Sequence, residues 1–185
     1  MQGIYEPTYR VKKAWGISPR ALKSHGITTV LADLDNTLVA WNKPEGGDDF
    51  FVWHEKLSDA KINLIVVSNN STGRVKKAVK ALGVPFESWS LKPLPRGIKK
   101  TLRDFNLSKE EVIMVGDQIM TDIVAANLAG VRSVLVKPLI ETDGFPTRIN
   151  RYFAKLVTKN KKENWEDDIV DPKSVSYTHL TLPTN

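Results

Sequence analysis

Short runs of apolar residues divide the chain at intervals. They lie at residues 28–34, 62–67, 112–115 and 134–136, and each has the length and bulk of a buried β-strand. Between them, apolar residues recur every three or four positions, which is the spacing of a helix with one buried face. Strands that alternate with helices predict an α/β fold, with a mainly parallel sheet between two layers of helices.

Helical segments occupy the stretches between these runs. The apolar spacing predicts one helix over residues 75–82, which Gly83 would end, and another over residues 98–105. A third is predicted over residues 119–126 and would end at Gly130. In a parallel sheet of this kind, ligands bind at the carboxyl ends of the strands. The residues that directly follow each strand are therefore the candidates for function.

Length and composition limit the classes of protein to which the chain can belong. The chain has 185 residues, 41% of them hydrophobic, which fits one domain with one buried core. No run approaches the ~18 apolar residues of a membrane span, and residues 1–20 do not resemble a secretory signal. The absence of cysteine excludes disulfides, thiolate chemistry and cysteine–zinc sites, and it suits a cytoplasmic protein. We expect a single domain over residues 1–174.

The end of the chain differs in character from the rest. Residues 175–185 read V-S-Y-T-H-L-T-L-P-T-N, which resembles the in-frame translation of a sequencing adapter. We therefore interpret this segment as an appended artefact and expect it to be disordered.

Two carboxylates leave the first predicted strand together. Asp33 and Asp35 lie two residues apart in D-L-D-N-T, and such crowding at the end of a buried strand is costly unless its charge is balanced. Asp117, in G-D-Q, follows the third strand in the same way, and Mg²⁺ prefers oxygen ligands. We expect a magnesium site here, with Asp33 as a nucleophile and Asp35 as a general acid and base. The alternative for Asp33 is a strand-end cap.

The end of the second strand carries residues suited to an anion. In V-S-N-N, Ser68 and Asn69 precede a helix whose first N–H groups are free, and Lys92, in L-K-P, adds positive charge. Asp122 would lie near the start of the helix after Asp117, where it could orient a metal-bound water or neighbouring ligands. Each residue has a structural alternative: a helix cap for Ser68, a surface lysine for Lys92, and an N-cap for Asp122.

In this order, D-x-D-x-T, the serine, the lysine and G-D-x4-D resemble the motifs of the haloacid dehalogenase (HAD) superfamily over residues 28–136. The resemblance implies a three-layer α/β/α, Rossmann-like fold. It also implies that Asp33 forms an aspartyl-phosphate and that Asp35 is the general acid and base. Mg²⁺ would be held by the side chains of Asp33 and Asp117 and by the main-chain carbonyl of Asp35. The phosphoryl group would be held by Ser68, Asn69 and Lys92.

No separate cap domain is expected over the site. Only 22 residues lie between Val39 and Ile62, and the stretch from Ser68 to Lys92 accommodates one helix and a short strand. Small metabolites usually need a lid that excludes water, so an open site suits a phosphate carried on a large molecule or a membrane lipid. A neighbouring subunit could also cover the site.

Outside the core motifs, residues 141–152 read E-T-D-G-F-P-T-R-I-N-R-Y. Together with those motifs, this segment resembles the YqeG family of bacterial HAD phosphatases without caps, over residues 10–160. That family is related to the phosphatidylglycerophosphate phosphatases of mitochondria and chloroplasts, which implies conversion of phosphatidylglycerophosphate to phosphatidylglycerol. Two alternatives stay open: a phosphatase of a soluble sugar phosphate, nucleotide or phosphoprotein, and an RNA- or ribosome-associated binding protein.

Basic residues gather at the two ends of the predicted domain. The net charge is +6; residues 1–30 carry five basic residues and one acidic, and residues 137–162 carry seven and two. Apolar residues at helical spacing in 149–156, and a mixed segment in 4–15, would suit a membrane surface or docking on the core. We expect a peripheral position on the inner face of the cell membrane. No nucleic-acid partner is expected, because no aromatic nucleic-acid motif accompanies the basic residues.

Overall fold

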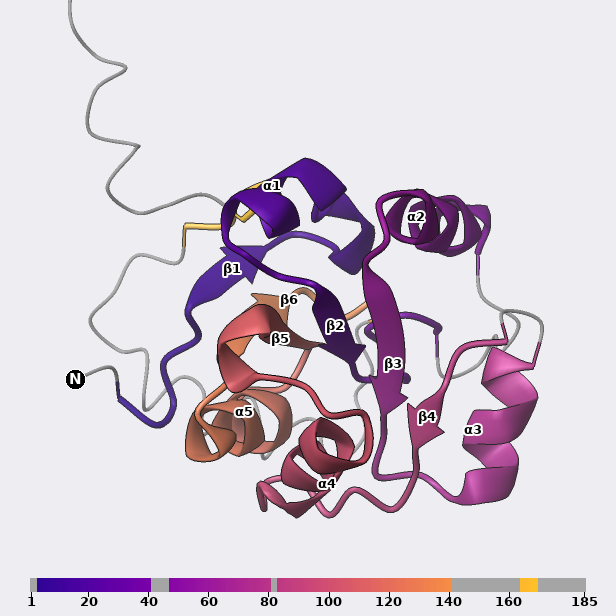
Figure 1. The fold of residues 1–185 in the computed structure, drawn as a ribbon, viewed down its shortest axis with the longest axis vertical. Helices are drawn as coiled ribbons and strands as arrows, with labels where there is room; N and C mark the ends of the chain where they lie inside the picture. The colour runs from indigo at the N-terminus through magenta and orange to yellow at the C-terminus, as the bar shows by residue number, and fades with distance from the viewer. Residues whose placement is uncertain (1–2, 41–46, 81–82, 141–163, 170–185) are drawn as a thin grey trace, which may run out of the picture.

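Parallel strands form the centre of the molecule (Figure 1). The computed structural model describes residues 3–40, 47–80, 83–140 and 164–169. Across the described sheet the strand order is β1-β6-β5-β2-β3-β4, and every neighbouring pair runs parallel. The strands are β1 (Tyr9–Val11), β2 (Thr29–Ala32), β3 (Asn63–Val67), β4 (Phe86–Glu87), β5 (Val112–Gly116) and β6 (Arg132–Val136).

Helices cover both faces of this sheet. They are α1 (Pro19–Ser24), α2 (Asp48–Asp59), α3 (Thr72–Val79), α4 (Arg96–Asp104) and α5 (Val124–Ala129), with 3-10 turns at Ala14–Gly16 and Lys109–Glu111 and a π-helical turn, η3, at Ile119–Ile123. Apolar side chains of α1, α2 and α3 pack into one core cluster, and those of α4 and α5 pack into another on the opposite face. The predicted three-layer α/β/α fold is confirmed.

Alternation along the strands explains the two clusters. In β2, Val30 and Ala32 belong to the cluster under α1 to α3, whereas Leu31 belongs to the cluster under α4 and α5. Successive side chains of a strand point to opposite faces, so a strand covered on both sides must be apolar at every position. This is why the central strands could be recognised as uninterrupted apolar runs.

The N-terminal segment docks on the core, one of the two arrangements that the sequence left open for residues 4–15. Within it, Tyr9–Val11 forms the edge strand β1 beside β6. Val11 is fully buried, and within residues 4–15 only Ile4 and Tyr5 keep large apolar side chains exposed. The pairing with β6 is a long-range contact, which a three-residue stretch of mixed polarity does not indicate.

The segment 164–169 returns to β1 and continues the pairing beyond it. The Lys12 N–H donates to the carbonyl of Glu166 at 2.9 Å, and the Glu166 N–H donates to the carbonyl of Arg10 at 3.1 Å. Ile169 is buried in the core, and Trp165 packs against the cluster that includes Leu135. This segment therefore covers the open edge of the sheet.

Two predictions fall on parts of the chain outside the described residues: the helix at 149–156 and the artefact at 175–185. Among the described residues, no helix combines the length and apolarity needed to cross a bilayer.

Candidate active site

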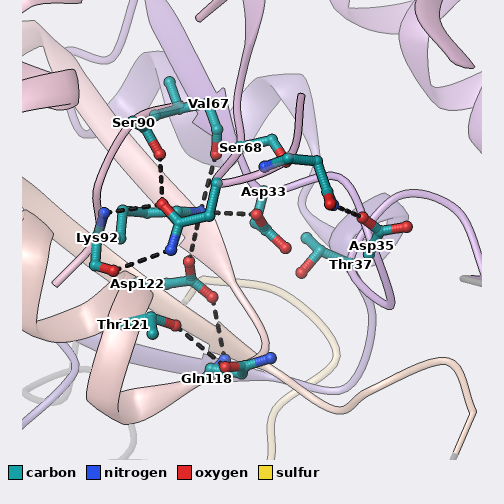
Figure 2. Close-up of polar contacts among 12 residues, drawn as sticks. Asp33, Asp35, Thr37, Val67, Ser68, Ser90, Lys92, Gln118, Thr121 and Asp122 are labelled. Atoms are coloured by element: carbon teal, nitrogen blue, oxygen red, sulfur yellow. Dashed lines mark hydrogen bonds and ion pairs between the residues drawn. The ribbon is translucent and has the colours of Figure 1, made fainter. Parts of the chain in front are cut away.

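Three predicted site segments meet at one edge of the sheet, because β2, β3 and β5 are adjacent and parallel. Asp33 directly follows β2, Ser68 follows β3 and Asp117 follows β5. The Asp33 N–H donates to the carbonyl of Val115 at 2.9 Å, which fixes the ends of β2 and β5 side by side. The carboxyl ends of the central strands thus form the floor of the site (Figure 2).

Three carboxylates gather on this floor. Asp33, Asp117 and Asp122 each place one oxygen within 4.8 Å of the other two. The Asp122 side chain is only 2% exposed, and its Oδ2 accepts a 3.1 Å hydrogen bond from the Gln118 N–H. The Thr37 hydroxyl donates to Asp117 Oδ1 at 3.3 Å. The structure therefore brings together the predicted Asp33 and Asp117, and it adds the carboxylate of Asp122 to them.

Lys92 lies between Asp33 and Asp122 (Figure 2). Its Nζ donates to Asp33 Oδ1 at 2.6 Å, to Asp122 Oδ1 at 2.7 Å and to the carbonyl of Val67 at 2.8 Å. The side chain is only 2% exposed, which excludes the alternative of a surface lysine. With these three acceptors, the ammonium is fully hydrogen-bonded, as a buried charge requires.

Burial and crowding set the ionisation of the cluster. Burial raises the pKa of Asp33 to about 7, although the charge of Lys92 opposes the rise. Burial, reinforced by the charge of Asp122, raises the pKa of Asp117 to about 8. Burial alone would lower the pKa of Lys92, but Asp122 and Asp33 outweigh it and the pKa is raised. One lysine therefore does not balance three carboxylates.

The residues present fit a divalent cation. The gathered side-chain ligands are all carboxylate oxygens, the type that Mg²⁺ and other hard cations prefer. A cation beside them would supply the positive charge that Lys92 alone does not provide. Asp33, Asp117 and Asp122 are the side chains positioned to hold it. Coordination by the Asp35 carbonyl stays a prediction.

Asp35 lies at the rim of the site, and its side chain is 21% exposed. One carboxylate oxygen accepts a hydrogen bond from the Asn70 side-chain amide, and the other pairs with the Arg74 guanidinium. After Asp35 the chain turns sharply, with Asn36 in the left-handed region at φ 61° and the Val39 N–H donating to the Leu34 carbonyl. Before this turn the two aspartates of the motif have different partners: Asp35 faces α3, whereas Asp33 faces Lys92.

Asn70 and Arg74, the two partners of Asp35, were not predicted from the sequence. Arg74 occupies the first turn of α3, where the helix dipole disfavours a cation. A basic residue at that position was the available signal, because it indicates a nearby anion that compensates for the dipole.

Ser68 and Asn69 have structural roles in this geometry. The buried Ser68 Oγ accepts from the Asn70 N–H at 3.1 Å, which is a bond within the turn before α3. The N-cap of α3 is Ser71, so Ser68 is not the helix cap of the alternative interpretation. Asn69 Oδ1 accepts from the Lys92 N–H and from the Ser90 hydroxyl, both at 2.8 Å, and its amide donates to the Lys92 carbonyl at 2.9 Å. Asn69 therefore holds the segment that carries Lys92, a role the sequence analysis did not predict for it. Contact of either residue with a phosphoryl group stays a prediction.

Comparison with known proteins agrees with this geometry. A family described as HAD-hydrolase-like matches residues 91–139. The chain is 33% identical to the "Probable phosphatase YqeG" of Bacillus subtilis over 171 residues, which cover 90% of this chain and 99% of that protein. It is also 46% identical to a glyceraldehyde 3-phosphate phosphatase of Pyrococcus furiosus, but over only 46 residues, 25% of this chain and 19% of that one.

A solved structure supports the fold. An uncharacterized protein from Listeria monocytogenes serotype 4b superimposes with a TM-score of 0.53 at 20% identity, covering 65% of this chain and 85% of that chain. The match to the Bacillus subtilis protein along almost the whole length of both chains identifies the family. Joined to the carboxylate cluster at the strand ends, it shows that this chain belongs to the YqeG family of HAD-like phosphatases.

Proposed function

We propose that the chain is a magnesium-dependent phosphomonoester hydrolase in which Asp33 becomes transiently phosphorylated. The observation that carries the proposal is the cluster of Asp33, Asp117 and Asp122 around the buried ammonium of Lys92. Two carboxylates of this cluster pair with Lys92. The side chain of Asp33 is 14% exposed, whereas that of Asp122 is 2% exposed. A phosphate ester approaching from solvent would therefore meet Asp33 before Asp122.

Two steps follow from this arrangement. In the first, a carboxylate oxygen of Asp33 forms a bond to phosphorus while the bond to the ester oxygen breaks, and that oxygen takes the proton of Asp35. In the second, Asp35 takes a proton from water, whose oxygen bonds to phosphorus, and the Asp33–phosphate bond breaks to release inorganic phosphate. Lys92 would attract the phosphoryl group, and a bound Mg²⁺ would supply further positive charge to its oxygens.

For the substrate we propose phosphatidylglycerophosphate, acted on at the inner face of the cell membrane. The family resemblance over residues 10–160 supports this lipid, and so does the open site. In the described residues, α2 is the element between β2 and β3, and α3 and β4 are those between β3 and Lys92. Neither insertion resembles a cap domain, so a headgroup at a membrane surface could reach Asp33.

A substrate comparison tests the proposal. Phosphate release is measured with phosphatidylglycerophosphate micelles and with a soluble panel that includes glyceraldehyde 3-phosphate, using a chain that ends at residue 174. We expect kcat/KM to be highest for the lipid and to depend on Mg²⁺. Equal or faster turnover of a soluble phosphate would reject the lipid substrate while leaving the phosphatase mechanism intact.

A further inference from the structure

A short loop beside the site exposes large apolar side chains. The loop, residues 88–95, joins β4 to α4, and we refer to it as the rim loop. Trp89 is 61% exposed, Leu91 48% and Leu94 56%. Among the described residues, these are three of the eight large apolar side chains that stay exposed. Three of them lie within six consecutive positions of one loop, and we call these three side chains the apolar patch; the exposed apolar residues common on protein surfaces are scattered singly.

The backbone of the rim loop turns these side chains outward. Trp89 and Leu91 have positive φ values of 51° and 59°, which residues other than glycine rarely adopt. Between and after them, Ser90 and Lys92 point inward and are buried. The Ser90 N–H donates to the Ser68 carbonyl at 3.0 Å, and the Gly97 N–H donates to the Ser90 carbonyl at 3.2 Å. The fold therefore holds an unfavourable backbone that places apolar groups in water, which calls for a functional reason.

The patch adjoins the catalytic residues. Leu91 directly precedes Lys92, whose Nζ contacts Asp33. The Trp89 N–H donates to the Asn70 carbonyl at 3.1 Å, and the side chain of Asn70 bonds to Asp35. A surface that covered the rim loop would therefore lie at the entrance to the carboxylate cluster.

Basic side chains continue the surface along α4. A groove is lined by Leu94 and Pro95 together with Arg96, Lys99, Lys100 and Arg103. Lys100 pairs with Glu87 and Asp104, and Arg103 pairs with Asp104, whereas no ion pair is found for Arg96 or Lys99 within the described part of the chain. Exposed apolar groups with cations beside them match the boundary of an anionic membrane, where apolar side chains enter the acyl region and cations meet headgroups.

We infer that the rim loop inserts into the surface of an anionic phospholipid bilayer and so presents the carboxylate cluster to headgroup phosphates. This inference rests on the proposed function, for which it names the contact surface. Trp89 suits the contact because indole rings favour the membrane–water interface. The positive charge on α4 favours a membrane over an uncharged apolar protein partner.

A fluorescent probe tests the contact directly. The chain has no cysteine, so Leu94→Cys introduces a single thiol that can carry the polarity-sensitive dye NBD. Val52→Cys, on α2, is the matched control, because Val52 is an apolar residue of similar exposure, 49%. With vesicles of phosphatidylglycerol and phosphatidylcholine, we expect a blue shift and increased emission at position 94 only. With phosphatidylcholine alone, we expect a much weaker change.

A double variant tests the consequence for turnover. Trp89→Asn with Leu94→Ser removes two apolar groups. Asparagine is chosen for position 89 because it tolerates the positive φ found there. We expect vesicle binding in sedimentation, and turnover of phosphatidylglycerophosphate in vesicles, to fall by roughly tenfold or more. Hydrolysis of p-nitrophenyl phosphate should be unchanged. The control pair Val52→Ser with Leu128→Ser removes exposed apolar groups elsewhere and should leave all of these measurements unchanged.

The outcomes separate this inference from the proposed substrate. Vesicle binding that needs the rim loop, with no hydrolysis of phosphatidylglycerophosphate, would reject the substrate and support the membrane contact. Hydrolysis of that lipid with equal vesicle binding by wild type and double variant would reject the contact alone. A dimer in sedimentation that the double variant abolishes would assign the patch to a second copy of the chain and overturn the inference.

Discussion

Asp33 and Asp35 leave the same strand, yet their carboxylates have different partners. Asp33 is bonded to the ammonium of Lys92, whereas Asp35 is held by Asn70 and Arg74 at the rim. The two proposed roles follow from this difference. The proposed nucleophile lies on the floor of the site, and the proposed proton donor lies at the rim, where a leaving group would depart to solvent.

Removing the nucleophile should abolish turnover. In Asp33→Asn, the amide neither attacks phosphorus nor binds a hard cation well. We expect no phosphate release and no acid-stable labelled phosphoenzyme, measured with a ³²P-labelled substrate. Labelled protein in this variant would assign the nucleophile elsewhere, and full biological function without turnover would favour a binding role for the chain.

Replacing the proton donor should slow both steps without abolishing them. We expect Asp35→Asn to reduce kcat by roughly 10²–10⁴-fold, the usual scale for loss of an acid–base group. Single-turnover kinetics would measure phosphorylation and dephosphorylation separately. Asp59→Asn, an exposed aspartate at the end of α2, is the control and should have normal rates. A near-normal rate for Asp35→Asn would contradict its role.

We expect Arg74 to affect turnover through its ion pair with Asp35. A hydrogen bond to a charged group contributes about 1.5–3 kcal/mol, so Arg74→Gln should reduce kcat by roughly tenfold to a hundredfold. The double-mutant cycle with Asp35→Asn is the decisive measurement, because Arg74→Gln should have little further effect once the carboxylate is gone. Additive losses in the cycle would show that Arg74 acts independently of Asp35.

At the scale of elements, the turn after β5 determines which carboxylates meet. The π-helical turn Ile119–Ile123 carries Asp122 back over the end of β5, against Gly116. A Cβ at position 116 would lie 2.3 Å from the Cβ of Asp122 and 2.4 Å from its Oδ2. Glycine is therefore required at position 116 for Asp122 to reach Lys92.

Adding one methyl group at this position should displace Asp122. We expect Gly116→Ala to weaken the apparent affinity for Mg²⁺ by about 10–100-fold, the usual cost of disturbing the residues around a metal site. The measurement is activity against Mg²⁺ concentration. Gly73→Ala is the matched control, because a Cβ there meets nothing within 4 Å. Unchanged Mg²⁺ affinity in Gly116→Ala would exclude Asp122 from the metal site.

At the scale of the whole molecule, the carboxylate cluster links stability to pH and to metal. The pKa of Asp33 is raised to about 7 and that of Asp117 to about 8, above their value of 3.8 in the unfolded chain. The folded state therefore binds these protons more tightly than the unfolded state. The stability that this contributes is present below pH ~4 and is lost as pH rises through 7 to 8.

We expect Mg²⁺ to restore the folding stability that the protein loses at higher pH. A cation competes with protons for the same oxygens, so saturating Mg²⁺ should raise Tm more at pH 8 than at pH 6. Thermal unfolding followed by circular dichroism at both pH values provides the measurement, and Asp33→Asn should show a smaller increment. A larger increment at pH 6 would contradict a metal bound by these carboxylates.

Much of the site could be predicted because strand ends are encoded locally. The apolar runs at 28–34, 62–67 and 112–115 mark the strands β2, β3 and β5, which are covered on both faces, and Asp33 and Asp117 directly follow β2 and β5. The partners of Asp35 could not be predicted in this way. Arg74 belongs to another element and lies 39 positions after Asp35 in the chain, so no local sequence pattern predicts that the two side chains meet.

By itself, the sequence determined the α/β fold, the parallel strands at its centre and the carboxylates at their ends, because burial on both faces leaves an uninterrupted apolar run. Only the tertiary structure decided how the side chains at those ends pair. In it, Asp122 lies in the carboxylate cluster, Asp35 pairs with Arg74, and Asn69 bonds to the segment that carries Lys92. It also made Tyr9–Val11 an edge strand. Those outcomes depend on contacts between distant segments, which form only when the chain packs.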